Sequence, residues 1–342
     1  MKAVVVCPGR GTYNKTELGY LQRHFPDAAL LAAFDEQRRF ADQPSLSGLD
    51  GAQRFSVAEH TRGDNASALI FAATLGDFLS IDGDKIDIVA VTGNSMGWYS
   101  ALACAGALEP EDGFRVANTM GTLMQRALIG GQLIYPFVGE DWRSQPERRA
   151  ELLATVDGIA AREGHALFLS IDLGGMLVLA GNEAGLSAFE SQVEPLQGRF
   201  PMRLANHAAF HTELMAPVAE QGRGQFPSDL FRSPDLPLID GRGAIWWPGA
   251  SDTDALHAYT LGTQVVETYD FTRAITIAAR EFAPDLFIIT GPGTTLGGAV
   301  AQSLILAEWR GMRDKADFQK LQAHQPLLAS MGMPEQRPTV TR

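Results

Sequence analysis

Short apolar runs alternate with longer amphipathic segments along most of the chain, which predicts alternating strands and helices. Nearly continuous apolar runs predict buried strands at residues 4–7, 86–92 and 286–290. Apolar positions at helical spacing predict helices at residues 66–79, 98–108 and 111–129. Residues 15–40 have helical character interrupted by Pro26, whereas residues 42–65 are rich in Gly, Ser, Asp and Pro and are predicted to be loop. This order is typical of an α/β domain.

The pattern changes near residue 130, where shorter elements follow one another closely. Strands are predicted at residues 132–138, 166–171, 176–180 and 199–205, with helices at residues 146–163 and 183–193. This order indicates a small α+β unit inserted into a larger α/β domain. We therefore predict a large domain at residues 1–130 and 206–310, a small subdomain at residues 131–205 and a C-terminal tail at residues 311–342. The tail is polar with little periodicity, and we expect it to be partly mobile.

Composition narrows the functional classes. The formal net charge of −12 argues against a nucleic-acid partner, which would select a basic face. No apolar run approaches the ~20 residues that span a bilayer, so no membrane association is expected, and residues 1–8 indicate a first strand rather than a signal peptide. Cys7 and Cys104 lack metal-ligand spacing and are expected to be buried thiols of a cytoplasmic protein. The scattered histidines give a metal site no support.

The most informative motif is Gly-Asn-Ser-Met-Gly at residues 93–97, between a predicted strand and a predicted helix. The two glycines permit a sharp turn that lifts the hydroxyl of Ser95 clear of the sheet. The helix N-terminus behind the serine favours developing negative charge. We therefore predict an enzyme that carries an acyl group on Ser95, and the motif alone is also compatible with an α/β-hydrolase.

Ser95 needs a base, and His211 is the leading candidate because it follows an apolar stretch at the start of a predicted helix. His207, on the same segment, is the alternative. The remaining histidines are predicted to lie on the surface or in loops: His24, His60, His165, His257 and His324. The glycine-rich loop at residues 8–11, Pro-Gly-Arg-Gly, can offer a backbone N–H to an oxyanion. It lacks the spacing of phosphate-binding loops.

Four motifs occur together in chain order, at residues 8–11, 93–97, 210–215 and 291–296. This combination resembles the malonyl-CoA:acyl-carrier-protein transacylase family, including the acyltransferase domains of polyketide and fatty-acid synthases. The family signatures are Pro-Gly-Gln-Gly, Gly-His-Ser-Leu/Met-Gly, a Phe/Ser-His-x-x-Leu-Met segment and a late Gly-Pro-Gly, and the match covers residues 1 to about 305. The resemblance implies a large α/β-hydrolase-like domain with an inserted ferredoxin-like subdomain.

The resemblance also implies roles for individual residues. Ser95 would be the nucleophile and His211 its general base, oriented by the backbone carbonyl of Gln264. The oxyanion hole would consist of the backbone N–H groups of Arg10 and Met96. The reaction would be ping-pong transfer from a CoA or carrier-protein thioester, through acyl-Ser95, to the pantetheine thiol of an acyl carrier protein. No metal or redox cofactor is implied.

One departure from the family bears on the acyl group. Malonyl-selective members have an Arg-Gly-x-x-Met-Gln segment whose arginine pairs with the malonyl carboxylate, and here Met120 occupies that position. Arg115 and Arg126 lie ~140° and ~120° around the axis of the predicted helix from Met120, so neither can take the place of the family's arginine. Leaving a carboxylate unpaired there costs on the order of 1–3 kcal/mol. We therefore predict a neutral acyl group, such as acetyl or a longer starter, rather than malonyl or methylmalonyl. The alternative is that Arg10 binds the carboxylate.

Smaller departures also fall in the expected acyl pocket. Asn94 replaces the usual histidine before the nucleophile, Ala208 replaces the first histidine of a His-Ala-Phe-His-type segment, and Phe210 is retained. Asn65 stands roughly where the family has Gln-Pro-Ala. The expected pocket residues are therefore Met120, Phe210, Asn94 and Asn65.

Two other functions remain open from the sequence. Relatives without the arginine include hydrolases that release acyl groups from carrier proteins, and a non-catalytic carrier-docking scaffold is a further alternative. Because carrier proteins are acidic and this chain is acidic, docking would require a local basic face. Two candidate faces are Arg143, Arg148 and Arg149, and Arg310, Arg313 and Lys315.

Overall fold

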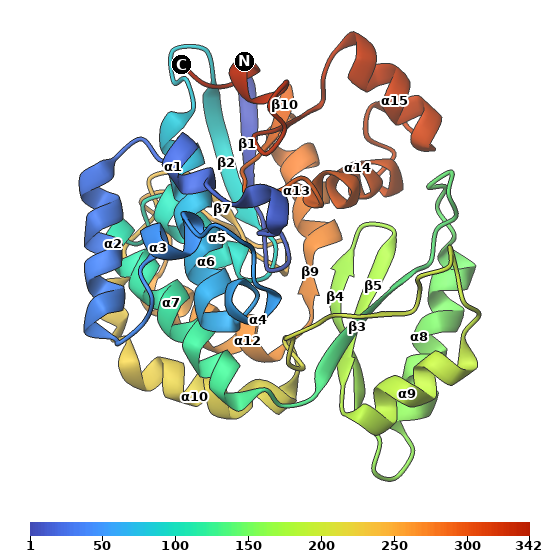
Figure 1. Ribbon diagram of the computed structural model, residues 1–342. Coiled ribbons are helices and arrows are strands. Elements are labelled where there is room, and N and C mark those ends of the chain that lie inside the picture. Colours follow the sequence, from blue (N-terminus) through green and yellow to red (C-terminus); the bar gives the residue numbers. More distant parts are fainter.

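The computed structural model describes residues 1–342 and contains two β-sheets surrounded by helices (Figure 1). The larger sheet has six strands in the order β11-β10-β1-β2-β7-β8, all parallel except β8. Its strands are β1 Lys2–Cys7, β2 Asp87–Gly93, β7 Leu238–Ile239, β8 Ile245–Trp246, β10 Leu286–Ile289 and β11 Leu328–Ser330. The centre of this sheet is buried on both faces, which explains the nearly continuous apolar runs of β1 and β10.

Helices pack on both faces of the larger sheet (Figure 1). On one side α5, α6 and α7 pack on one another, and on the other α13 packs on α14. These helices are α5 Gly63–Ser80, α6 Gly97–Cys104, α7 Pro110–Ala127, α13 Phe271–Phe282 and α14 Leu296–Leu306. The other helices outside the smaller sheet are α1 Tyr20–His24, α2 Ala28–Phe40, α3 Leu46–Asp50, α4 Val57–His60, α10 Ala216–Gln225, α11 Thr253–Ala258, α12 Gln264–Val266 and α15 Lys315–His324. No helix combines the length and apolar character needed to cross a bilayer.

The smaller sheet has the order β6-β3-β5-β4-β9. Its elements are β3 Gly131–Pro136, α8 Pro146–Ala160, β4 Leu167–Leu173, β5 Met176–Gly181, α9 Glu183–Gln192, β6 Met202–Arg203 and β9 Tyr269–Asp270. Helices α8 and α9 cover its outer face, and its inner face is turned toward the larger domain (Figure 1). The strand β9, which comes from outside residues 131–205, completes this sheet.

Side chains of the smaller sheet alternate between its two faces. On β5, Leu177 and Leu179 pack into the core under α8 and α9, whereas Val178 belongs to the core of the larger domain. On β4 the register shifts between Leu169 and Ile171. Because of this shift, Leu169 packs with the helix-side core and Ile171 lies on the opposite, inner face.

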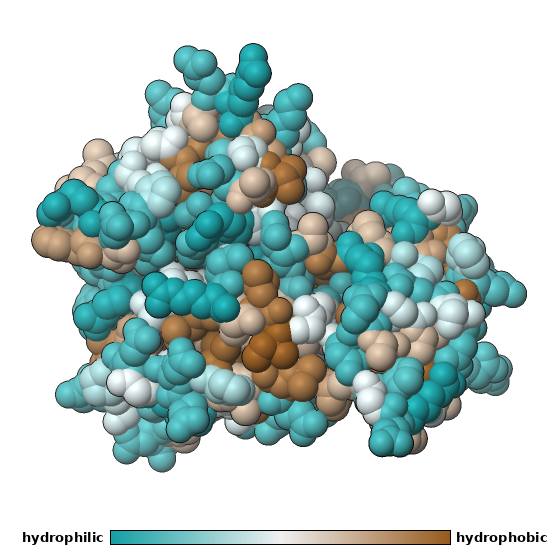
Figure 2. Space-filling view, turned by 60° about the horizontal axis from the view of Figure 1, so that its bottom comes forward, coloured by the Kyte–Doolittle hydropathy of each residue, from teal (hydrophilic) through white to brown (hydrophobic).

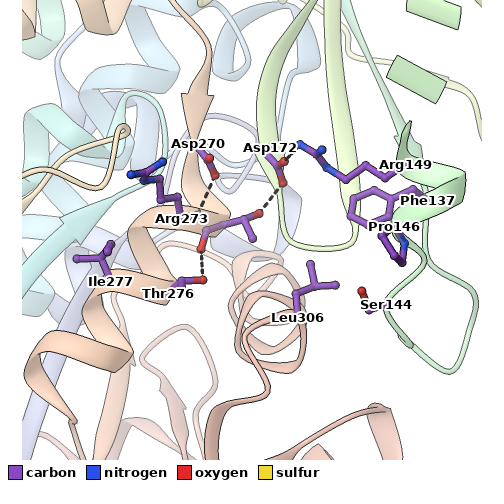
Figure 3. A pocket seen from close by; sticks show the side chains of 11 residues that line it. Phe137, Ser144, Pro146, Arg149, Asp172, Asp270, Arg273, Thr276, Ile277 and Leu306 are labelled. Carbon is purple, nitrogen blue, oxygen red and sulfur yellow. Dashed lines mark hydrogen bonds and ion pairs between the residues drawn. The ribbon is translucent and has the colours of Figure 1, made fainter. Parts of the chain in front are cut away.

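The two domains are joined at the end of β4 (Figure 3). Arg149 of α8 donates to the carboxylate of Asp172 at 2.5 Å, and Thr272 of α13 donates to its other oxygen at 2.6 Å. On another face, apolar side chains gather where the two lobes meet (Figure 2). Leu128 and Ile129, in the link between α7 and β3, are 44% and 38% exposed. Polar contacts therefore join the domains at Asp172, and an exposed apolar surface lies at the chain link between them.

The structure corrects one predicted loop and one predicted strand. Residues 42–65, predicted as loop, contain α3, α4 and the start of α5. The serines that suggested loop are helix caps, since the side chains of Ser45 and Ser56 accept from backbone N–H groups in the first turns of α3 and α4. The strand predicted at residues 199–205 is reduced to the two residues of β6.

The predicted tail at residues 311–342 is also corrected, because it contains α15 and the edge strand β11. It is held to the rest of the domain by Arg337, whose Nη1 pairs with the buried carboxylate of Asp77 at 2.6 Å. Asp77 also accepts from the hydroxyl of Tyr20 at 2.7 Å and from the backbone N–H of Gly291 at 2.6 Å. The C-terminal segment therefore shares an ion-pair network with the Gly-Pro-Gly turn.

We predict that Arg337→Ala lowers the free energy of unfolding by about 3–5 kcal/mol, because it leaves the Asp77 carboxylate buried without its cation. Guanidinium unfolding followed by tryptophan fluorescence measures this change. Arg342→Ala, at the exposed C-terminus, is the control and should change the stability little. A loss below about 1 kcal/mol for Arg337→Ala would show that the ion pair does not hold the segment.

Candidate active site

Ser95 sits at the apex of a strained turn between β2 and α6, with φ of +56°. The glycines on either side are required by close backbone contacts. A Cβ on Gly97 would collide with the carbonyl oxygen of Cys7, and one on Gly93 would collide with the backbone of Gly97. The turn therefore places Ser95 at the carboxyl end of β2, where ligands bind in parallel sheets.

The hydroxyl of Ser95 lies 2.7 Å from Nε2 of His211. On the other side of the ring, Nδ1 lies 2.6 Å from the backbone carbonyl oxygen of Gln264. A carbonyl only accepts hydrogen bonds, so Nδ1 carries the proton and Nε2 is left to accept from the serine. This contact geometry is the one expected for a nucleophile and its base.

The side chain of Gln264 also contacts the nucleophile turn. Its Nε2 donates to the backbone oxygen of Ser95 at 3.1 Å, and its Oε1 accepts from the hydroxyl of Tyr99 at 3.2 Å. Gln264 follows directly after a π-helical turn at Tyr259–Thr263, a type of irregularity that is frequent at functional sites. One residue thus fixes both His211 and the backbone of Ser95.

Burial lowers the pKa of His211 to about 4, while the hydrogen bond to the Gln264 carbonyl acts in the opposite direction. The ring is therefore neutral near pH 7 and able to accept a proton. His207, the alternative base, pairs through Nδ1 with Oε1 of Gln132 at 2.8 Å. Burial and the nearby charge of Arg10 hold the pKa of His207 well below its usual value. The structure thus pairs His211 with Ser95.

Two backbone donors face the nucleophile. Arg10 and Met96 line a small space with Ser95 and His211, which we call the base cavity, of about 20 Å³. The backbone N–H groups of Arg10 and Met96 donate to no protein acceptor. Met96 also precedes the first residue of α6, where the helix dipole favours an anion. These two donors can stabilise an oxyanion formed at Ser95.

A larger space also reaches Ser95. This nucleophile cavity, of about 420 Å³, lies between the two domains. Phe210 and Asn94 line it, and Phe210 also lines the base cavity. The buried Oδ1 of Asn94 has no hydrogen-bond partner. The remaining lining of the nucleophile cavity is largely apolar and comes in part from the inner face of the smaller sheet.

Two predicted pocket residues do not reach either cavity. Met120 is fully buried on α7, and its sulfur packs against Gly222 of α10. Asn65 is buried too, with its Oδ1 accepting from Arg38 and its Nδ2 donating to the carbonyl of Glu59. Both side chains belong to the packing of the larger domain, so the structure does not support their prediction as pocket residues.

Three neighbours of Met120 and Asn65 do line the base cavity. Gly121 and Met124 come from the same segment of α7 as Met120, and Ser67 lies two positions after Asn65. The chain retains the Gly-x-x-Met part of the family's Arg-Gly-x-x-Met-Gln segment, and this match could have identified Gly121 and Met124 as cavity residues. His60, predicted for the surface, is buried, and its Nε2 lies 3.0 Å from the carbonyl oxygen of Leu49.

The side chain of Arg10 lies at the junction of these cavities. Its Nη2 donates to the carbonyls of Thr61 and Asn206, each at 3.0 Å, and its guanidinium stacks over Phe210. Its Nε is buried without a partner. Burial lowers the pKa of Arg10 to about 10, so the side chain stays charged near pH 7.

A separate cavity of about 460 Å³ does not contain the nucleophile (Figure 3). This junction cavity lies between α8, β4 and α13. Both of its carboxylates are engaged within the protein, since Asp172 binds Arg149 and Thr272, and Asp270 caps α13.

No family model matches the chain. The phenolphthiocerol synthesis polyketide synthase type I of Mycobacterium marinum is 27% identical over 318 residues, which cover 90% of this chain and 14% of that protein. The malonyl CoA-acyl carrier protein transacylase of Bacillus subtilis is 27% identical over 210 residues, which cover 61% of this chain and 62% of that protein. The chain thus spans less than two thirds of the length of these relatives.

Solved structures are similar over the whole chain. The acyl-carrier-protein S-malonyltransferase of Burkholderia pseudomallei superposes with a TM-score of 0.75 at 18% identity, covering 99% of each chain. At that identity the similarity shows the fold, a large α/β domain with a small subdomain, as the sequence predicted.

We predict that Ser95→Ala abolishes covalent labelling by a serine-directed fluorophosphonate, measured by intact-protein mass spectrometry. His211→Ala should slow labelling by about 10²–10⁴-fold, because the base is lost. Ser100→Ala is the matched control, since Ser100 is buried on α6 with an unpartnered hydroxyl. Labelling that survives in Ser95→Ala would place the nucleophile elsewhere.

The pH dependence of labelling follows from the lowered pKa of His211. Because the neutral ring is the base, the rate should stay constant from pH 7.5 to about 5.5 and fall to half near pH 4. An ordinary histidine would give a midpoint near 6.5. Circular dichroism at each pH is the control for unfolding. A midpoint near 6.5 in folded protein would contradict the buried, neutral base.

Proposed function

We propose that this chain, which has the fold of malonyl-CoA:acyl-carrier-protein transacylases, is a serine acyltransferase. It would move an acyl group from a CoA or carrier-protein thioester to an acyl carrier protein, in polyketide or fatty-acid-type biosynthesis. The observation that carries the proposal is the 2.7 Å contact between Ser95 and His211 beside two unpaired backbone donors. The names of the relatives support the reaction class.

The reaction has two similar halves. Nε2 of His211 takes the hydroxyl proton as Ser95 Oγ attacks the thioester carbonyl. The oxyanion that forms is stabilised by the N–H groups of Arg10 and Met96. The C–S bond then breaks, and His211 returns the proton to the departing thiolate. A second pantetheine thiol repeats these steps in reverse on acyl-Ser95, which regenerates the serine.

We further propose that the acyl group is neutral. Met120 lies outside both cavities and does not bear on the choice of acyl group. The proposal therefore depends on whether Arg10 can bind a carboxylate. A bidentate pair with a carboxylate requires two N–H groups on one edge of the guanidinium. Nη2 of Arg10 already serves two carbonyls, and its Nε is enclosed. No complete edge of Arg10 is left for a carboxylate.

The proposed partner is the pantetheine-bearing form of an acyl carrier protein. Of the two basic faces suggested by the sequence, the structure brings Arg143 and Lys315 into one region, but Arg143 is paired with Asp141 and Asp314. Arg149 is likewise paired with Asp172. Arg199 lines the nucleophile cavity, stacks on Phe200 and has no carboxylate partner. We favour Arg199 as a cation available to the carrier.

We predict that acetyl-CoA or a longer neutral acyl-CoA adds its acyl mass to Ser95, and that holo-carrier protein then removes it and gains that mass. Intact-protein mass spectrometry follows both steps. Malonyl-CoA should react more slowly, and Arg10→Ala should alter the malonyl and acetyl rates by the same factor. If malonylation is fast in the wild type and selectively lost in Arg10→Ala, Arg10 binds the malonyl carboxylate and the neutral acyl group is wrong.

The same experiment separates the other functions. Water in place of the second thiol would make the protein a hydrolase, seen as free acid without acyl-carrier product. A scaffold would leave Ser95 unmodified by thioesters and by the fluorophosphonate. Either result would overturn acyl transfer.

A further inference from the structure

The inner face of the smaller sheet forms an apolar wall opposite Ser95. Five side chains of the sheet line the nucleophile cavity: Ile134, Ile171, Leu173, Met176 and Val178. We infer that this wall binds the hydrocarbon chain of a medium-length saturated acyl group carried on Ser95. The inference rests on the proposed acyltransferase function and adds the class of acyl group.

The size of the two cavities at Ser95 decides where a chain can lie. The base cavity, between His211 and Met124, holds about 20 Å³, which is little more than one water molecule. It can take no more than the first carbon of an acyl group. The nucleophile cavity of about 420 Å³ is the only one of the two that can hold a longer chain.

The chemistry of the wall favours a hydrocarbon. Ile134, Leu173 and Met176 are only partly buried, so a chain can cover their exposed surface without rearrangement. Val178 and Ile171 complete the wall as buried members of the large core. The neighbouring polar side chain of Gln132 is already satisfied, because it accepts from His207 and donates to Ser170. A chain that carried its own polar groups would find few partners on this wall.

The volume also limits the length of the chain. A methylene group occupies about as much space as a water molecule, ~30 Å³ in the liquid, and the pantetheine arm must enter the same cavity. At that size an eight-carbon chain occupies ~240 Å³, which leaves room for the end of the arm in the cavity of about 420 Å³. Each methylene that becomes covered should raise the rate of Ser95 acylation about fourfold, until the wall ends.

The test compares chain lengths on Ser95 with two kinds of reagent. Acetyl-, hexanoyl-, octanoyl- and malonyl-CoA report thioester acylation. Ethyl- and octylphosphonofluoridate report the site without a thioester, since Ser95 Oγ bonds to phosphorus, fluoride leaves and His211 takes the proton. We expect octanoyl-CoA and the octyl reagent to react at least about 50-fold faster than their two-carbon counterparts.

Variants locate the chain. Val178→Phe should reduce the octyl rate at least tenfold while leaving the ethyl rate within about twofold. Ile171→Ala should move the optimum toward longer chains, which keeps the test valid if Val178→Phe does not fold. Val57→Phe is the matched control. Val57 is exposed and lines a neighbouring cavity of about 250 Å³ that does not contain Ser95, so its substitution should not change the length profile.

The outcomes are distinguishable. Equal rates for two and eight carbons, a preference for malonyl-CoA, or loss of the length profile in Val57→Phe would overturn the apolar wall as the chain site. Acylation of Ser95 would still stand in those cases. If neither thioesters nor phosphonofluoridates modify Ser95, the proposed function itself is overturned.

Discussion

The contact between Gly97 and the carbonyl oxygen of Cys7 is the constraint on which the site depends. It lets α6 begin directly against the end of β1, and the backbone N–H of Asn94 fixes the same carbonyl at 2.9 Å. The loop that follows β1 then lies beside the nucleophile turn. As a result, the N–H groups of Arg10 and Met96, far apart in the sequence, face one space next to Ser95. Any side chain at residue 97 would separate them.

A second theme of the site is the avoidance of charge. The base is neutral because it is buried, and a backbone carbonyl rather than a carboxylate orients it. Of the two arginines that line the nucleophile cavity, Arg10 donates hydrogen bonds to the carbonyls of Thr61 and Asn206. In a low-dielectric surrounding, fixed dipoles can stabilise a developing oxyanion without the desolvation cost of buried ions. The apolar wall of the smaller sheet and the neutral acyl group that we propose follow the same principle.

Local motifs predicted much of the site, because turn and cap chemistry is encoded by adjacent residues. The turn that carries Ser95 illustrates this, whereas the choice of His211 over His207 and the role of Gln264 depended on the resemblance to the transacylase family. The direction of a helical side chain is a different matter. The side chains of successive helical residues point in directions that differ by ~100°. The helix α7 was therefore predicted correctly, but the residues that face the cavity are Gly121 and Met124 rather than Met120. The three-residue edge strand β11 was missed because so short a run carries no periodicity and depends on its pairing with β10.

The register shift in β4 has a consequence for how the smaller domain could change over time. Residues that hold its helices in place and residues that face Ser95 alternate along β5, and the shift maintains that separation where β4 would otherwise present Leu169 and Ile171 to the same side. The packing under α8 and α9 and the surface that faces Ser95 are therefore carried by different residues. Leu173 and Met176, which are only partly buried on the inner face, are the positions of this sheet most open to divergence and to engineering.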